Sequence, residues 1–204
     1  MKTLRLFVIL ICVVFCCPAL AETITVYNSY SLVLERASVD ESFSSIISGD
    51  GTATQTHTDI YVSFTASTTS NQFQKLRRTP LTFPISESLP TNAVIDSAVL
   101  YLRGTGKTGD LGTDLYFTFS GITVADKTAF TKSDYNGVTN TPLTSSVSYA
   151  DWSITGYNAF NLNSDGINYI SRDSATVFCV RHSWDLNANF GGSWSSGNAS
   201  GLSF

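Results

Sequence analysis

Charged residues are scarce in this sequence, and positive charge is scarcer than negative charge. Only 14% of the 204 residues are charged, and the 12 basic residues are outnumbered by 16 acidic ones. Nucleic acids and anionic membranes are bound through basic surfaces. The composition therefore argues against both as partners.

Long apolar runs are also missing, apart from one near the N-terminus. Residues 6–15 are all apolar, they follow Lys2 and Arg5, and Ala19 and Ala21 supply the small-x-small pattern of a signal peptidase site. The run is shorter than the roughly 20 apolar residues of a transmembrane helix. We therefore predict a signal peptide over residues 1–21, a secreted protein, and no membrane contact after cleavage before Glu22. An uncleaved anchor is the alternative.

Cysteine is nearly absent from the predicted mature chain. Three of the four cysteines lie in the predicted signal peptide, which leaves Cys179 alone, and the mature net charge becomes −6. A single cysteine forms no intrachain disulfide, so an apolar core must hold residues 22–204 together. Cys179 lies in an apolar run, and we expect a small buried hydrophobe there. An intermolecular disulfide or a reactive thiol is the alternative.

Helical periodicity is scarce too, whereas apolar and polar residues often alternate between turns rich in Ser, Thr, Asn and Gly. Alternation predicts β-strands, and only residues 164–171 suggest a short helix. Strands without crossover helices pack as antiparallel layers. We predict an all-β, antiparallel β-sandwich of jelly-roll type, a single domain over residues 22–204 with at most one short helix. The clearest predicted strands are residues 59–64, 81–85, 94–103, 115–120, 157–162 and 176–181.

Two segments interrupt this pattern. Pro80 and Pro84 interrupt the alternation of Leu81, Phe83 and Ile85. Because proline cannot donate a hydrogen bond to a ladder, we expect an edge or bulged strand there. Residues 104–112 contain four glycines, and we expect a long hairpin loop.

Recognised catalytic motifs are missing. His57 and His182 are the only histidines, and neither a zinc-protease motif nor a nucleophile elbow occurs. We therefore expect a protein that is not an enzyme. A glycoside hydrolase or polysaccharide lyase is the alternative, and it requires a converging set, such as two carboxylates about 5 to 9 Å apart.

Hard oxygen ligands occur in one glycine-containing loop. Asp110 and Asp114 lie four residues apart there, which suits a structural calcium ion. The spacing is not that of an EF-hand. The alternative is that both side chains bond to their own turns. We expect no other cofactor.

One loop combines tryptophan with polar side chains. Trp184 and Trp194 flank a segment that includes Arg181, Asp185 and Asn187. Aromatic rings pack on the apolar faces of sugars, and polar side chains bond their hydroxyls. We predict that these five residues bind a ligand. The alternative is that the tryptophans pack over one end of the core.

Four segments occur in an order found in known modules. Residues 66–73 precede a long strand, and residues 86–100 combine a polar turn, a proline and the phrase Ile-x-Ser-Ala-x-Leu. Residues 156–163 read Gly-Tyr-Asn-x-Phe-x-Leu-Asn, and residues 183–194 carry both tryptophans. Together they resemble the DNRLRE-like family of secreted or virion-associated jelly-roll modules, which are of the carbohydrate-binding kind. The resemblance covers most of the mature chain and implies that fold.

The chain departs from the family pattern in two places. Pro84 follows Phe83 where the family places an aspartate, and the chain stops at Phe204 where members continue through a closing strand. The resemblance therefore implies that the domain lacks its last strand. Either the sequence is incomplete, or an open edge pairs with another chain.

These observations favour a non-catalytic secreted module for carbohydrate binding or surface adhesion, with a polysaccharide or cell-surface glycan as partner. The alternative is a self-assembling structural subunit of a surface layer, filament or virion. That subunit would be a homo-oligomer joined through the open edge strand.

Overall fold

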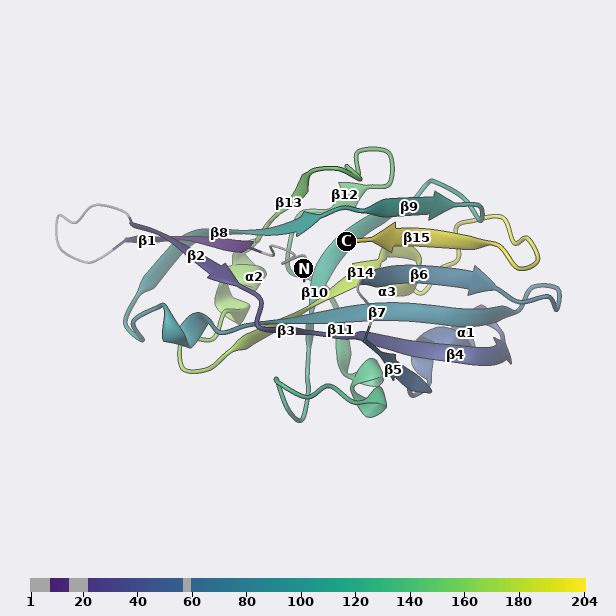
Figure 1. The fold of residues 1–204 in the computed structure, drawn as a ribbon, viewed down its shortest axis with the longest axis horizontal. Coiled ribbons are helices and arrows are strands. Elements are labelled where there is room, and N and C mark those ends of the chain that lie inside the picture. The colour runs from purple at the N-terminus through teal and green to yellow at the C-terminus, as the bar shows by residue number, and fades with distance from the viewer. Residues whose placement is uncertain (1–7, 15–21, 57–59) are drawn as a thin grey trace, which may run out of the picture.

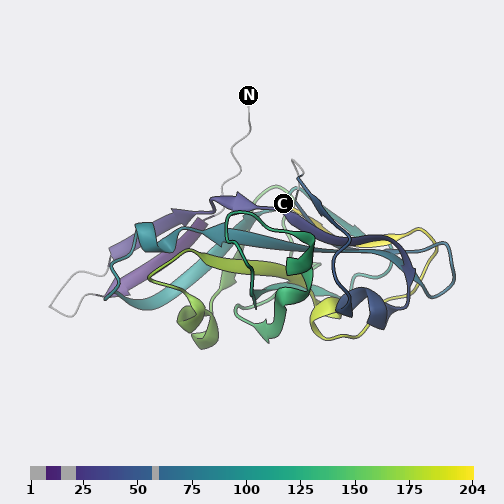
Figure 2. The same ribbon diagram turned by 90° about the horizontal axis from the view of Figure 1, so that it is seen from below.

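The computed structural model describes residues 8–14, 22–56 and 60–204. These residues form antiparallel sheets packed as a β-sandwich, which confirms the predicted fold class. In Figure 2 the three α-helices lie on the same side of the molecule. Within the described ranges, no helix has the length and apolar character to cross a bilayer.

The smaller sheet has four antiparallel strands in the order β13-β8-β1-β2 (Figure 1). β8 has the bounds that alternation predicts. β1 lies inside the predicted signal peptide, and residues 1–7 and 15–21 of that segment are outside the described residues. Cleavage and secretion therefore stay predictions. The strands are β13 (Tyr157–Asn161), β8 (Val94–Arg103), β1 (Val8–Val14) and β2 (Glu22–Tyr27).

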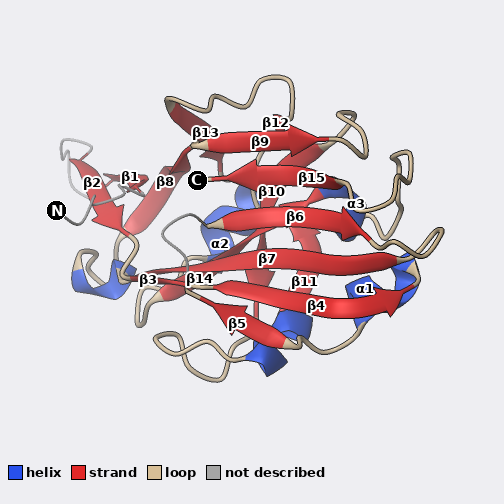
Figure 3. Ribbon diagram, turned by 45° about the vertical axis from the view of Figure 1, so that its right-hand side comes forward, coloured by secondary structure: helices blue, strands red, loops and turns tan. Residues whose placement is uncertain are grey.

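The larger sheet follows the order β11-β10-β14-β7-β6-β15-β9, and β12, β3, β4 and β5 pair beside this path. Figure 3 shows β4, β7, β6, β15 and β9 side by side. The strands are β3 (Tyr30–Ser31), β4 (Val33–Glu41), β5 (Ala53–Gln55), β6 (Tyr61–Ala66), β7 (Phe73–Phe83), β9 (Gly106–Gly109), β10 (Tyr116–Ile122), β11 (Val138–Pro142), β12 (Val147–Ser148), β14 (Thr176–His182) and β15 (Ala199–Ser203).

β7 joins the two halves of the larger sheet. Its first half pairs with β4 and β6, and its second half pairs with β3 and β14. Pro80 lies in the second half, opposite Cys179, so the predicted edge strand is wrong. Proline is accommodated because the ladder on the other side is interrupted there: β3 ends opposite Leu81, and β4 begins to pair at Arg78.

The core lies between the sheets and is rich in phenylalanine. Phe119 of β10 meets Phe160 of β13 edge to face, with ring centres 5.0 Å apart, and both side chains are buried. Each buried phenylalanine contributes about 1.5–3 kcal/mol. Cys179 is fully buried, and burial raises the pKa of its thiol to about 12. It is the small buried hydrophobe that the sequence predicts.

The described residues form three short α-helices, so the prediction of at most one is wrong. The predicted helix at residues 164–171 is found as α2 (Ser164–Tyr169), and Asn163 caps it by accepting from the Gly166 amide at 2.8 Å. The other two helices are α1 (Phe43–Ser48) and α3 (Ser183–Leu186). α3 has only four residues, about one turn, which is too short to show the helical period in a sequence.

The C-terminal segment bears on two further predictions. β15 pairs with β6 on one side and with β9 on the other, and Phe204 is buried. β15 itself is therefore not an open edge, which was one of the two alternatives for this end of the domain, and the missing last strand stays a prediction. β9 also occupies residues 106–109 of the predicted hairpin loop, because backbone pairing with β15 compensates for the low strand propensity of glycine.

Candidate functional site

The predicted tryptophan surface is largely inside the protein. Trp184 is only 4% exposed, and its ring packs against His182 and Phe190 at ring-centre distances of 4.6 and 4.8 Å. Arg181 and Asp185 are buried as well. These three side chains do not form the exposed face that we expected. For Trp184, packing over the core is the arrangement found.

Arg181 and Asp185 belong to a buried charge triad with Arg78. The Nε atoms of both arginines donate to Oδ2 of Asp185, each at 2.8 Å. Burial would raise the pKa of Asp185, but the two guanidinium groups outweigh burial and hold it at about 2. A recess of 290 Å³ lies beside the triad. Every guanidinium nitrogen already has a partner, so the triad is structural.

The other two predicted ligand residues lie apart from the triad. Trp194 is half-buried and donates from Nε1 to the Gln72 carbonyl at 2.8 Å. Asn187 is exposed and donates to the Tyr116 hydroxyl at 3.1 Å. The five predicted residues therefore do not converge on one surface.

The two predicted calcium ligands lie on one exposed connection. Asp110 and Asp114 are exposed in the connection between β9 and β10. Across the described ranges, no group of three or more His, Cys, Asp or Glu side chains gathers that could hold a metal. Two carboxylates fall well short of the roughly six to eight oxygens that calcium takes.

His182 has no access to a substrate. It is fully buried, and its ring lies 5.2 Å from those of Phe64 and Phe117. Burial lowers its pKa to about 3, against the opposing effect of Asp185. Its Nδ1 accepts from the Trp184 amide at 3.2 Å, which caps α3. His57 lies outside the described residues.

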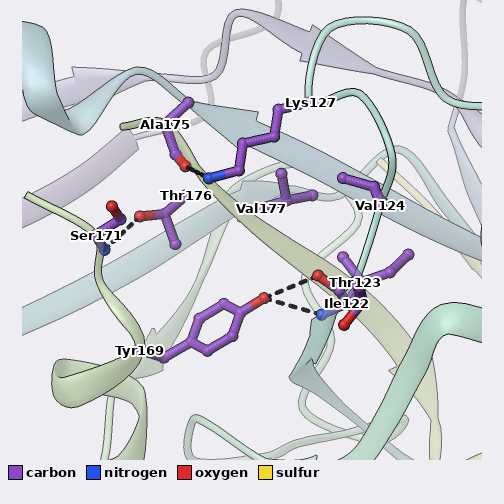
Figure 4. Close-up of a pocket in the computed structure, with 9 residues that line it drawn as sticks. All are labelled: Ile122, Thr123, Val124, Lys127, Tyr169, Ser171, Ala175, Thr176 and Val177. Carbon is purple, nitrogen blue, oxygen red and sulfur yellow. Dashed lines mark hydrogen bonds between the residues drawn. The ribbon is translucent and has the colours of Figure 1, made fainter. Parts of the chain in front are cut away.

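A recess of 280 Å³ lies between α2, β10 and β14 (Figure 4). Its polar groups are engaged with the protein. The Tyr169 hydroxyl donates to the Ile122 carbonyl at 3.1 Å and accepts from the Ile122 amide at 3.0 Å. Lys127 donates to the Ala175 carbonyl at 2.6 Å. These bonds tie loops to the sheet, and apolar side chains make up most of the remaining lining.

A third recess, of 190 Å³, lies on the solvent face of the larger sheet, and we call it the Tyr61 groove. Strand register aligns Arg77, Ser63, Gly201 and Thr108 in one row across β7, β6, β15 and β9. Tyr61 lies two residues along β6 from Ser63, on the same face. The groove is lined by Tyr61, Ser63, Thr65, Arg77, Lys107, Thr108 and residues 199–203.

The guanidinium group of Arg77 is held in one orientation in the groove. The guanidinium carbon of Arg77 lies 5.2 Å from the centre of the Tyr61 ring, a cation–π distance. Its Nε donates to Glu35 at 3.0 Å, and Glu35 also accepts from Gln55 at 3.0 Å. The groove therefore presents an aromatic ring beside an oriented guanidinium group.

The floor of the groove is bare backbone at Gly201. A Cβ atom there would lie 2.3 Å from the Val62 carbonyl oxygen and 2.5 Å from the Ser63 Cβ. Only glycine fits without a shift of the neighbouring strand. This keeps the centre of the row open.

Exposed tyrosines also gather on the outer face of the smaller sheet. Tyr27 and Tyr157 are 51% and 47% exposed, and Tyr101 lies edge-on to Tyr157 at 6.5 Å. Register aligns Tyr27 and Tyr101 on either side of β1. Alternation places these tyrosines on the side away from the core, but it gives no sign that they share one surface.

No protein-family model, curated protein or solved structure matches this chain. The resemblance to DNRLRE-like modules therefore stays a prediction.

Proposed function

We propose that the protein is a secreted, non-catalytic module that binds a polysaccharide or a cell-surface glycan, and that the Tyr61 groove is its contact surface. The observation that supports this most is the row of polar side chains beside Tyr61 and Arg77, open over Gly201. A sugar-binding site needs an aromatic side chain that packs on the C–H groups of the sugar and polar side chains that bond its hydroxyls.

The groove suits this role better than the other two recesses. Each guanidinium nitrogen beside the triad recess is bonded to a protein acceptor, and the polar groups at Tyr169 and Lys127 are bonded to the backbone. In the groove, Ser63, Thr65 and Arg77 are half-buried on a solvent-facing sheet. Ser63 and Thr65 can bond a ligand without breaking a buried network, while the Nε of Arg77 stays bonded to Glu35.

We expect Tyr61→Ala to weaken glycan binding about tenfold, because removing the ring removes the apolar contact. Tyr61→Phe keeps the ring and should bind within about threefold of the parent. The measurement is a glycan array on the parent protein, followed by titration calorimetry of all variants with the strongest ligand.

Tyr157→Ala is the matched control, because Tyr157 is an exposed tyrosine on the other sheet. Its affinity should equal that of the parent. Loss of binding in Tyr157→Ala with full binding in Tyr61→Ala would place the site on the smaller sheet. A parent protein that binds no glycan on the array would contradict the proposed function itself.

A further inference from the structure

β1 occupies an interior place in the smaller sheet. It pairs antiparallel with β2 on one side and with β8 on the other. Leu10, for example, lies opposite Thr25 of β2 and Val99 of β8. In Figure 1 the three strands lie next to one another. We call the place between β2 and β8 the β1 position.

The residues of β1 all belong to the segment that the sequence predicts to be a signal peptide. Cleavage before Glu22 would remove β1 from between its two neighbours. The facing backbone groups of β8 and β2 would then lose their hydrogen-bond partners. Unpaired strand edges of this kind recruit another strand.

We propose that, in the processed protein, strand Glu22–Tyr27 of a second copy fills the β1 position. This inference rests on the secretion part of the proposed function. The incoming strand pairs antiparallel with β8, as β1 does. The partner is therefore another copy of this chain, joined by strand addition.

Strand β2 matches the β1 position in length and pattern. It has six residues and β1 has seven. Burial alternates along β2: Ile24 is half-buried and Val26 is buried, whereas Thr25 and Tyr27 are exposed. In β1, Ile9 and Ile11 lie opposite the buried Leu100 and Ala98. In the register of β1, an inserted β2 would place Ile24 and Val26 opposite the buried Leu100 and Ala98.

The chain's own β2 does not replace β1 in the same way. Both β2 and β8 run antiparallel to β1, so β2 runs parallel to β8. Closing the gap from within one chain would require a parallel pairing, while a second copy can supply the antiparallel one.

This exchange is head-to-tail. A copy that donates its β2 still has the β8 edge that β1 leaves unpaired, and a further copy can pair with that edge. Where each copy donates to a copy other than the one from which it receives, such contacts produce rings or open filaments. We therefore expect a series of oligomers of increasing size.

A pair of cysteines tests the inserted strand directly. Within one chain, Thr25 and Val99 are separated by β1, so their Cα atoms lie about two strand spacings, roughly 9.6 Å, apart. A disulfide requires a Cα separation below about 7 Å. In the proposed assembly, residue 25 of one copy lies beside residue 99 of the next, or beside residue 97 if the strand shifts by two.

The experiment uses the full chain carrying Thr25→Cys with Val99→Cys, or with Ser97→Cys, secreted by a host that processes signal peptides. Mass spectrometry establishes the N-terminus, and copper–phenanthroline oxidises facing thiols to disulfides. We expect a protein that begins at Glu22 and a ladder of disulfide-linked multimers on a non-reducing gel. Thr25→Cys with Asn161→Cys is the matched control, because Asn161 lies opposite Val99 on the far side of β8. It should give no ladder.

Three results would overturn the proposal. The first is a secreted protein that keeps residues 1–21, because β1 then stays in place. The second is an intrachain disulfide in a monomer, which means that β2 closes onto its own β8. The third is a processed monomer with no disulfide in either cysteine pair. Glycan binding is read at Tyr61 on the other sheet, so its failure is distinguishable from each of these.

Discussion

We expect the Asp185→Asn variant to lose about 3–5 kcal/mol of unfolding free energy, the typical cost of removing one partner from a buried ion pair. The substitution keeps the shape of the side chain but removes the only carboxylate in the triad. Arg78 and Arg181, both almost fully buried, would then face each other without a compensating charge. Urea unfolding monitored by tryptophan fluorescence measures the change.

Asp151→Asn is the control for this variant. Asp151 is exposed and accepts a hydrogen bond from Ser148 at 2.6 Å, so it shares the local turn chemistry without the burial. Its substitution should cost less than about 1 kcal/mol. If Asp185→Asn were as mild as this control, the triad would not be a stabilising element.

We expect acid to destabilise the protein through His182, beginning well above the pH at which carboxylates titrate. The unfolded chain binds a proton at His182 below about pH 6.5, but in the fold burial lowers the pKa to about 3. The unfolded state therefore holds more protons between these values, and stability falls as the pH falls. The slope is about 1.4 kcal/mol per pH unit, or about 3 kcal/mol between pH 6.5 and pH 4.

His182→Phe tests the source of this slope. The side chain lies against Phe64, Phe117 and Trp184, so a phenylalanine ring fits the surroundings, although the cap on the Trp184 amide is lost. The variant should be less stable at pH 7 but should lose much less stability between pH 6.5 and pH 4. Urea unfolding of both proteins across this range is the measurement. Equal slopes would assign the acid sensitivity to other groups.

Much of the fold could be predicted because alternation reports which side of a strand is buried. β8 has the predicted bounds, and Val62, Phe64, Phe117 and Phe119 are buried as their spacing indicates. Strand order is a different matter. Pro80 lies in a central strand because of where β3 stops and β4 starts, which no local pattern encodes.

The candidate site was harder to predict than the fold. In the sequence, nothing distinguishes Tyr61, Ser63 and Arg77 from the residues of any solvent-facing strand. Only the register of β6 and β7 brings them together. The same holds for the triad, because Arg78 and Asp185 are separated by 107 residues. Trp184 was misassigned for a related reason. Its neighbours Arg181 and Asp185 are polar by type, but they neutralise each other inside the protein.

The position of β15 determines when this fold can form during synthesis. β15 lies between β6 and β9. These two strands therefore cannot be joined in the larger sheet until residues 199–203 have been synthesised. Pairings this distant in sequence also form slowly. The strip formed by β6, β15 and β9 can therefore be completed only after residue 203 has been synthesised.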